Sequence, residues 1–184
     1  MAKIVANILF GLMVALYPLA VYFGIQKFSI QHVSIFVLSL IILKFLFQDN
    51  KNKQQILLLI SACALIIFTL ISQNDIGIRL YPVLVNFSLL AIFAISLKYP
   101  PTFIEKLARL TTPELPESGV QYTKKVTKVW CAFFIFNGSV AGYTALFSSI
   151  ENWALYNGLI SYLLMGLIFA VEFIVRQKVK RDNA

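Results

Sequence analysis

The chain is poor in the side chains that most often do chemistry. Its 184 residues include one histidine, two cysteines and eight Asp plus Glu. No cluster of His, Cys and carboxylates has metal-ligand spacing, no run resembles a glycine-rich phosphate loop, and no Ser, His and acid set is suggested. We therefore expect no catalytic, cofactor-binding or metal site. His32 is expected to be structural, and Cys63 and Cys131 to be packed thiols rather than a disulfide.

Charge is also scarce, and hydrophobic residues are in excess. Charged residues make up 13% of the chain and hydrophobic residues 59%, against roughly 25% and 45–50% in a typical soluble domain. One small core cannot bury so much apolar surface. The net charge of +8 would suggest a nucleic-acid partner in a soluble protein, but basic residues in a membrane protein mark its cytoplasmic loops. The composition thus indicates an integral membrane protein with no nucleic-acid partner.

Long apolar runs divide the chain into membrane spans. A helix of about 17 to 25 apolar residues crosses a hydrocarbon core roughly 30 Å thick and satisfies its own backbone polar groups. Six such runs predict an all-α, polytopic membrane helix bundle in a single domain, residues 1–184. The predicted spans are residues 5–25, 31–47, 56–72, 81–97, 128–148 and 153–176.

The basic residues predict which side each connection occupies. With a cytoplasmic N-terminus, fourteen of the sixteen Lys and Arg lie on the inner side, and only Lys27 and Arg79 lie outside. Because short cytoplasmic loops concentrate basic residues, we expect both termini inside. Trp130 and Trp153 would then lie at opposite membrane faces, where amphipathic rings favour the headgroup region.

The first span has two interpretations. Lys3 followed by an apolar run resembles a signal peptide, whose removal would leave five spans and a C-terminus still inside. No small-x-small cleavage site ends the run, however, and Pro18 and Tyr22 continue it. This pattern favours a retained transmembrane helix.

The connection at residues 98–127 is the longest polar segment. Pro100 and Pro101 end the preceding helix, and Thr102 with Glu105 forms a capping-box pattern that predicts a short amphipathic helix at the interface. Its apolar side would carry Phe103, Ile104, Leu107 and Leu110, with Glu105, Lys106 and Arg109 facing water, and an irregular lead near Glu117 would precede the fifth span. Lys106, Arg109, Lys124, Lys125 and Lys128 form a candidate surface for lipid headgroups or a protein partner.

Polar residues inside the spans form a second candidate site, because such groups are costly in hydrocarbon and face the bundle or a cavity. Glu172 lies four residues before Arg176, which predicts an ion pair on one helix face. The whole set is either interhelical glue or the lining of a groove for a lipid-like molecule. Its members are Asn86, Asn137, Thr144, Asn157, Ser161 and Glu172.

Several runs carry a resemblance to a known family. They are Pro100 to Thr102, Ile104, Glu105, Leu107 to Arg109, Pro113 to Pro116, residues 129–137, Trp153, Ala154, Tyr156 to Gly158, and Phe173 to Arg176. With these residues the chain resembles a small integral membrane protein encoded in bacterial aryl polyene and xanthomonadin-type pigment clusters. More distantly, it is similar to the intracellular septation protein A family.

The resemblance implies a bacterial inner-membrane protein that works beside machinery for envelope lipid or polyene biosynthesis. Our leading hypothesis is a non-enzymatic accessory or scaffold whose partners are membrane lipids and biosynthetic proteins of the cytoplasm or membrane. A transporter of a lipid or polyene intermediate is the first alternative, and a membrane-embedded acyl- or aryl-transfer enzyme is the second. One kind of acyl-transfer enzyme, a ketosynthase, would need a nucleophilic Cys with two basic partners. The chain has a single histidine, His32, predicted on the outer side, and it does not supply these partners.

Overall fold

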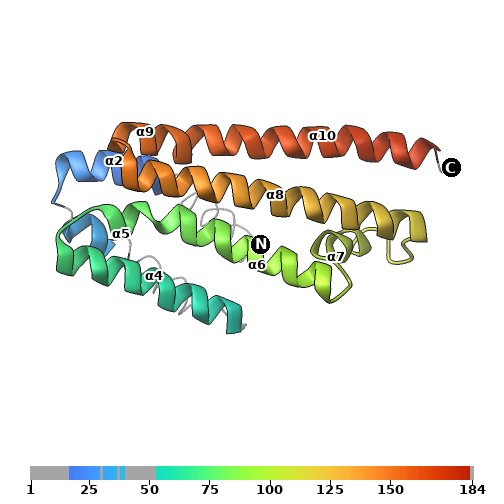
Figure 1. Ribbon diagram of the computed structural model, residues 1–184, viewed down its shortest axis with the longest axis horizontal. Coiled ribbons are helices and arrows are strands. Elements are labelled where there is room, and N and C mark those ends of the chain that lie inside the picture. Colours follow the sequence, from blue (N-terminus) through green and yellow to red (C-terminus); the bar gives the residue numbers. More distant parts are fainter. Residues whose placement is uncertain (1–16, 30, 37, 40–52, 183–184) are drawn as a thin grey trace, which may run out of the picture. The chain divides into compact units, whose positions relative to one another are not determined.

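A computed structural model describes residues 17–29, 31–36, 38–39 and 53–182 of the chain. All regular structure in these residues is helical, as the sequence predicts (Figure 1). The elements are α2 (Tyr17–Lys27), α4 (Lys53–Ser72), α5 (Ile76–Arg79), α6 (Tyr81–Lys98), α7 (Phe103–Arg109), α8 (Glu117–Phe147), α9 (Ile150–Leu155), the π-helical turn η1 (Tyr156–Ile160) and α10 (Ser161–Asp182).

Three helical segments in the described part of the chain are long and apolar enough to cross a membrane. They are Ile76–Lys98, Glu117–Phe147 and Ile150–Val179, and they contain the last three predicted spans except for Ser148. The third predicted span, residues 56–72, lies within α4, where Cys63–Ser72 is a shorter apolar stretch. Much of the predicted spans 5–25 and 31–47 lies outside the described residues, so the count of six and the orientation stay predictions.

The fifth predicted span begins earlier than expected. α8 starts at Glu117 rather than at residue 128, so the predicted irregular lead is wrong. Its first turns are supported by a bond from the amide of Val120 to the carbonyl of Pro116, and by a side-chain bond from Gln121 to Glu117 four residues earlier. The 31 residues of α8 extend over about 46 Å, more than the roughly 30 Å of a hydrocarbon core. α8 is therefore long enough for the turns that carry Lys124 and Lys125 to extend beyond the hydrocarbon core.

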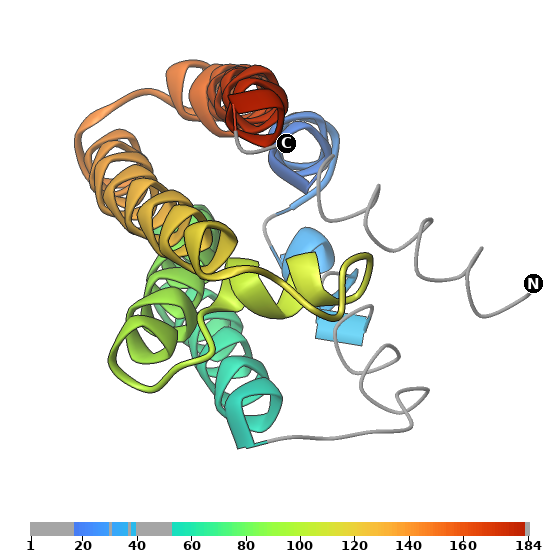
Figure 2. The same cartoon turned by 90° about the vertical axis from the view of Figure 1, so that its right-hand side faces the viewer.

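The chain divides into two compact units, the first comprising residues 1–84 and 141–164. In this unit α2 lies against α9 and η1 (Figures 1 and 2), and α4 contacts α5. The core cluster of the unit consists of buried side chains from α2, α4, α5 and α9, together with Val33 and with Ala145 of α8. Its members are Tyr17, Val21, Val33, Ile66, Ile78, Ala145, Trp153 and Ala154.

Gly77 explains how α5 can lie so close to α4. A Cβ at this position would lie 2.2 Å from Thr69 Oγ1 and 2.4 Å from the carbonyl oxygen of Leu65. Both distances are far below van der Waals contact, so only glycine fits without movement of the α4 backbone.

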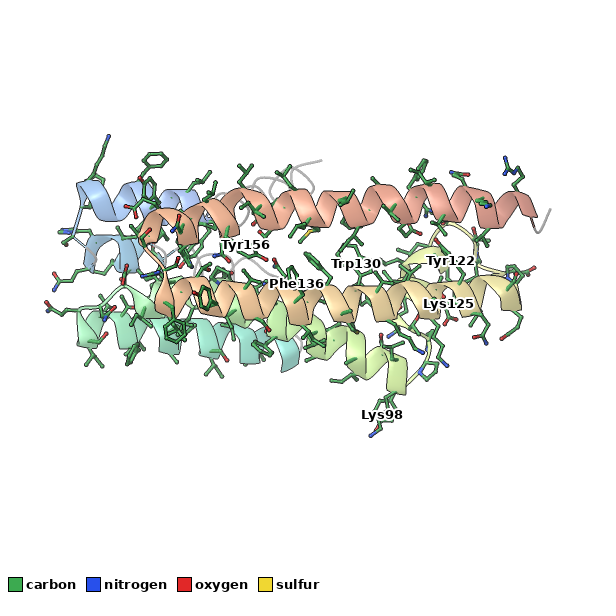
Figure 3. All side chains as sticks on the ribbon, turned by 45° about the horizontal axis from the view of Figure 1, so that its top comes forward. Lys98, Tyr122, Lys125, Trp130, Phe136 and Tyr156 are labelled. Atoms are coloured by element: carbon green, nitrogen blue, oxygen red, sulfur yellow. The ribbon has the colours of Figure 1, made fainter. Side chains whose placement is uncertain are left out.

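The second unit comprises residues 85–140 and 165–184, and aromatic rings form its centre. Trp130 and Phe93 are each in ring contact with Phe134, and Trp130 also contacts Phe169 of α10 at 4.7 Å between centroids. Figure 3 shows Trp130 on the side of α8 that faces α10. Trp130 is buried in this unit and Trp153 is fully buried in the first unit, so both rings pack against protein, and their positions at opposite membrane faces stay a prediction.

The short helix α7 is present as predicted, with its full capping box. The Thr102 hydroxyl accepts from the Glu105 amide, and a Glu105 carboxylate oxygen accepts from the Thr102 amide. α7 lies beside the end of α6, because the Phe103 ring packs on Phe93 at 4.4 Å and the Phe103 amide donates to the buried Ser96 hydroxyl (Figure 1). Part of its predicted apolar stripe thus packs on protein, whereas Leu107 and Leu110 are exposed, and Leu110 follows the helix.

Replacing Phe103 with alanine is expected to weaken the attachment of α7 to α6 by about 2 kcal/mol, the transfer free energy of a large apolar side chain. Limited proteolysis of the 98–117 connection in lipid nanodiscs measures this loosening as faster cleavage. Leu110→Ala is the matched control, because that side chain is 80% exposed and its removal takes away little packing. Equal cleavage rates for the two variants would contradict the packing described for Phe103.

Candidate functional site

The first unit contains a cluster of buried polar groups around Arg79, at the end of α5. Its Nη2 donates to the carbonyl of Thr144 at 2.7 Å and also to the carbonyl of Ser148. Its Nη1 lies 3.8 Å from an oxygen of Asp75, the residue before α5. Trp153 Nε1 in turn donates to the carbonyl of Arg79 at 3.0 Å. The guanidinium therefore ties α5 to the end of α8, and the indole ties α9 to α5.

Asn157 lies in the π-helical turn η1 and belongs to the same cluster. Its Nδ2 donates to Thr144 Oγ1 at 3.2 Å and to the carbonyl of Trp153 at 2.9 Å. Ser161 Oγ donates to the carbonyl of Asn157 at 3.2 Å. Three predicted site residues, Thr144, Asn157 and Ser161, are thus brought together by direct hydrogen bonds.

Two buried atoms of this cluster have no hydrogen-bond partner among the described residues, namely Arg79 Nε and Asn157 Oδ1. A second polar contact of the unit is satisfied, since the Tyr17 hydroxyl donates to the carbonyl of Ile78 at 2.9 Å. The cluster therefore combines well-paired groups with one donor and one acceptor that retain bonding capacity.

In the second unit, Asn86 and Asn137 form a direct interhelical pair. Asn137 Nδ2 donates to Asn86 Oδ1 at 3.0 Å, and both side chains are buried. Gly138 lies next to this pair, and a Cβ there would be only 3.1 Å from Asn86 Cβ. The glycine thus permits the close approach of α6 and α8 at which two short amides can meet.

Glu172 makes the ion pair with Arg176 that the sequence predicts, at 3.7 Å. Its second partner, Tyr122 on α8, donates to Glu172 Oε1 at 3.3 Å and to the Glu172 carbonyl at 3.2 Å. Figure 3 shows Tyr122 on the side of α8 that faces α10. Glu172 therefore links two helices as well as two turns of one helix.

The predicted basic surface is exposed, with one exception. Lys106, Lys124, Lys125 and Lys128 are exposed, and none of them is in a salt bridge with a described carboxylate. Arg109 instead donates to Glu105 Oε1 at 2.8 Å and 3.0 Å and to the carbonyl of Pro113. Glu105 is buried rather than facing water as predicted, because its oxygens are occupied by Arg109 and by the helix cap. We therefore place Arg109 in a structural role.

The remaining candidates carry no evident chemistry. His32 is exposed and shares a hydrogen bond of 2.6 Å with the Ser29 hydroxyl. Cys63 and Cys131 are free thiols, as predicted. Within residues 17–29, 31–36, 38–39 and 53–182, no group of three His, Cys, Asp or Glu side chains is placed to hold a metal ion.

Arg79 and Trp153 are the site residues that sequence reasoning missed. Arg79 was predicted only as an outer charge, although the spacing from Asp75 to Arg79 is the same four residues that identified the Glu172 pair. An arginine so close to the start of an apolar span is the signal that could have drawn attention to it.

Comparisons with models of protein families, with curated proteins and with solved structures found no match for this chain.

Proposed function

We propose that the chain is a non-enzymatic accessory or scaffold protein of a bacterial inner membrane. Its exposed lysines bind anionic headgroups and a cytoplasmic protein of envelope lipid or aryl polyene biosynthesis. The observation that carries the proposal is the contrast between the two candidate sites. Polar groups in the spans bond to other groups of the protein, as Asn137 does to Asn86 and Ser161 to the carbonyl of Asn157, whereas Lys106, Lys124, Lys125 and Lys128 are exposed.

The length of α8 supports the same proposal. Lys124, Lys125 and Lys128 lie in its first turns, before the apolar stretch that begins at Val129. Each lysine near an anionic membrane surface contributes about 1 kcal/mol of attraction. Three of them on one rigid helix give a binding surface of fixed geometry, which suits recruitment of an acidic partner.

Replacing Lys124, Lys125 and Lys128 together by glutamine is expected to leave the protein at normal abundance and to abolish cross-linking to its partner. The side chains are exposed, so their removal affects the fold little. Quantitative immunoblotting measures abundance, and cross-linking in the native membrane followed by mass spectrometry measures partner capture. The matched Lys→Arg triple variant keeps the charge and is expected to retain capture. Normal capture by the glutamine variant would overturn the scaffold proposal.

Asn137→Ala tests the alternative, a transporter of a lipid or polyene intermediate. If the amide pair is a structural tie, the variant is expected to lose about 0.6 kcal/mol of stability, typical of an interhelical hydrogen bond in membrane, and polyene yield should follow protein abundance. Glu172→Gln is expected to behave in the same way. Full loss of yield at normal abundance in both variants would favour the transporter, since a pathway group acts on its ligand more than on the fold.

A further inference from the structure

The buried cluster around Arg79 and Asn157 contains one free donor and one free acceptor. Arg79 Nε and Asn157 Oδ1 are both buried, and neither has a hydrogen-bond partner among the described residues. Both residues bond to the same two neighbours, Thr144 and Trp153. The two atoms therefore belong to one local network in the first unit.

The orientation of the Asn157 amide is fixed by that network. The carbonyl of Trp153 can only accept, so the group 2.9 Å from it must be Nδ2. Thr144 Oγ1 donates its proton to the carbonyl of Ala141 at 3.0 Å and so accepts from Nδ2 as well. A flipped amide would place Oδ1 against these acceptors. Oδ1 is consequently a true acceptor with unused capacity.

The Arg79 guanidinium is constrained in a similar way. Its Nη2 is occupied by two carbonyls and its Nη1 faces Asp75, which leaves the Nε proton as a donor. Asp75 already supplies a negative charge beside the guanidinium. An anionic ligand is therefore not needed to balance the charge of Arg79. Such a ligand would also have no proton to donate to Asn157 Oδ1.

We propose that Arg79 Nε and Asn157 Oδ1 bind a hydroxyl group, supplied by a water molecule or by a hydroxylated amphiphile. A hydroxyl oxygen can accept from Nε–H while its own proton is donated to Oδ1, so a neutral hydroxyl has the donor and the acceptor that these two atoms lack. A cation cannot accept from Nε–H, and a deprotonated acid cannot donate to Oδ1. The position of Asn157 in a π-helical turn fits the proposal, because such turns often occur at functional sites.

Radiolytic labelling of the full chain in lipid nanodiscs prepared in ¹⁸O-water tests the site. Trp153 is fully buried and bonds to both residues, whereas Trp130, which is 4% exposed, lies among aromatic rings. If water fills the site, Trp153 is expected to incorporate ¹⁸O several-fold faster than Trp130. Ser161→Ala should keep this difference, because Ser161 bonds only to the Asn157 carbonyl, while Asn157→Leu should abolish it.

An amphiphile in the site gives a different result. Trp153 is then labelled as slowly as Trp130 until the protein is delipidated, and native mass spectrometry finds a hydroxylated molecule on the wild type but not on Asn157→Leu. Equal labelling of the two tryptophans before and after delipidation, with no hydroxylated molecule retained, would overturn the proposal. The wild-type comparison decides this even where Asn157→Leu fails to fold.

Discussion

Replacing Arg79 with alanine is expected to lower the free energy of unfolding by about 3 kcal/mol, chiefly because two hydrogen bonds from a charged group to carbonyls are lost. The guanidinium bonds to the carbonyls of Thr144 and Ser148 and lies beside Asp75, so its removal leaves all three groups without this partner. In a chain of this size that loss corresponds to a fall in melting temperature of roughly 6 to 12 °C. Thermal unfolding in nanodiscs, followed by tryptophan fluorescence, measures it.

Lys27→Ala is the matched control, because Lys27 is a basic residue at the end of α2 whose side chain is exposed. Its melting temperature should stay close to that of the wild type. Arg79→Lys should fall between the two, since an ammonium keeps the charge but lacks the planar set of donors that reaches two carbonyls and a carboxylate. An Arg79→Ala variant as stable as Lys27→Ala would contradict the structural role of Arg79.

Gly77→Ala is expected to be similarly damaging, at about 3 kcal/mol, the upper end of typical overpacking costs. The new Cβ would collide with Thr69 Oγ1 and with the carbonyl of Leu65. Thr69 is fully buried and its hydroxyl donates to that same carbonyl, so neither atom can simply swing aside. The collision forces α5 away from α4 and loosens the first unit, which thermal unfolding of the variant measures.

Gly166→Ala is expected to stabilise the protein, in contrast to Gly77→Ala. Apart from its chain neighbours and the backbone of its own helix, no atom of the described residues lies within 4 Å of a Cβ built at Gly166. The residue lies inside α10, so alanine should stabilise the helix by roughly 0.5–1 kcal/mol. The two Gly→Ala variants are therefore expected to shift the melting temperature in opposite directions. A shift of the same sign and size in both would contradict the close approach of α4 and α5.

The elements that depend on local pattern could be predicted from the sequence. The last three apolar spans, the capping box of α7 and the Glu172–Arg176 pair all follow from residue spacing along one stretch of chain. The polar candidates were found because polar side chains stand out in apolar helices. Which of them meet, such as Asn86 with Asn137, depends on contacts between helices and had to come from the structure.

Features that depend on tertiary packing could not be predicted in this way. The ring contacts of Trp130 are one example, because its partners Phe93 and Phe169 are remote from it in sequence. The start of α8 at Glu117 could not be predicted from hydropathy, because its first turns contain Gly119 and charged residues. Such residues do not stop a helix that continues into an apolar stretch. The π-helical turn at Asn157 has no composition signal, because it is an insertion in the helical register rather than a change of residue type.

We propose that the basic first turns of α8 face the cytoplasm from a membrane-spanning chain. Cysteine labelling tests it most directly, with Glu117→Cys and Glu151→Cys introduced singly into a Cys63→Ser, Cys131→Ser background. Both glutamates are exposed and lie in the first turns of α8 and α9, respectively. We expect a membrane-impermeant maleimide to label position 151 in intact spheroplasts and position 117 only after lysis. Labelling of position 117 before lysis would contradict the account.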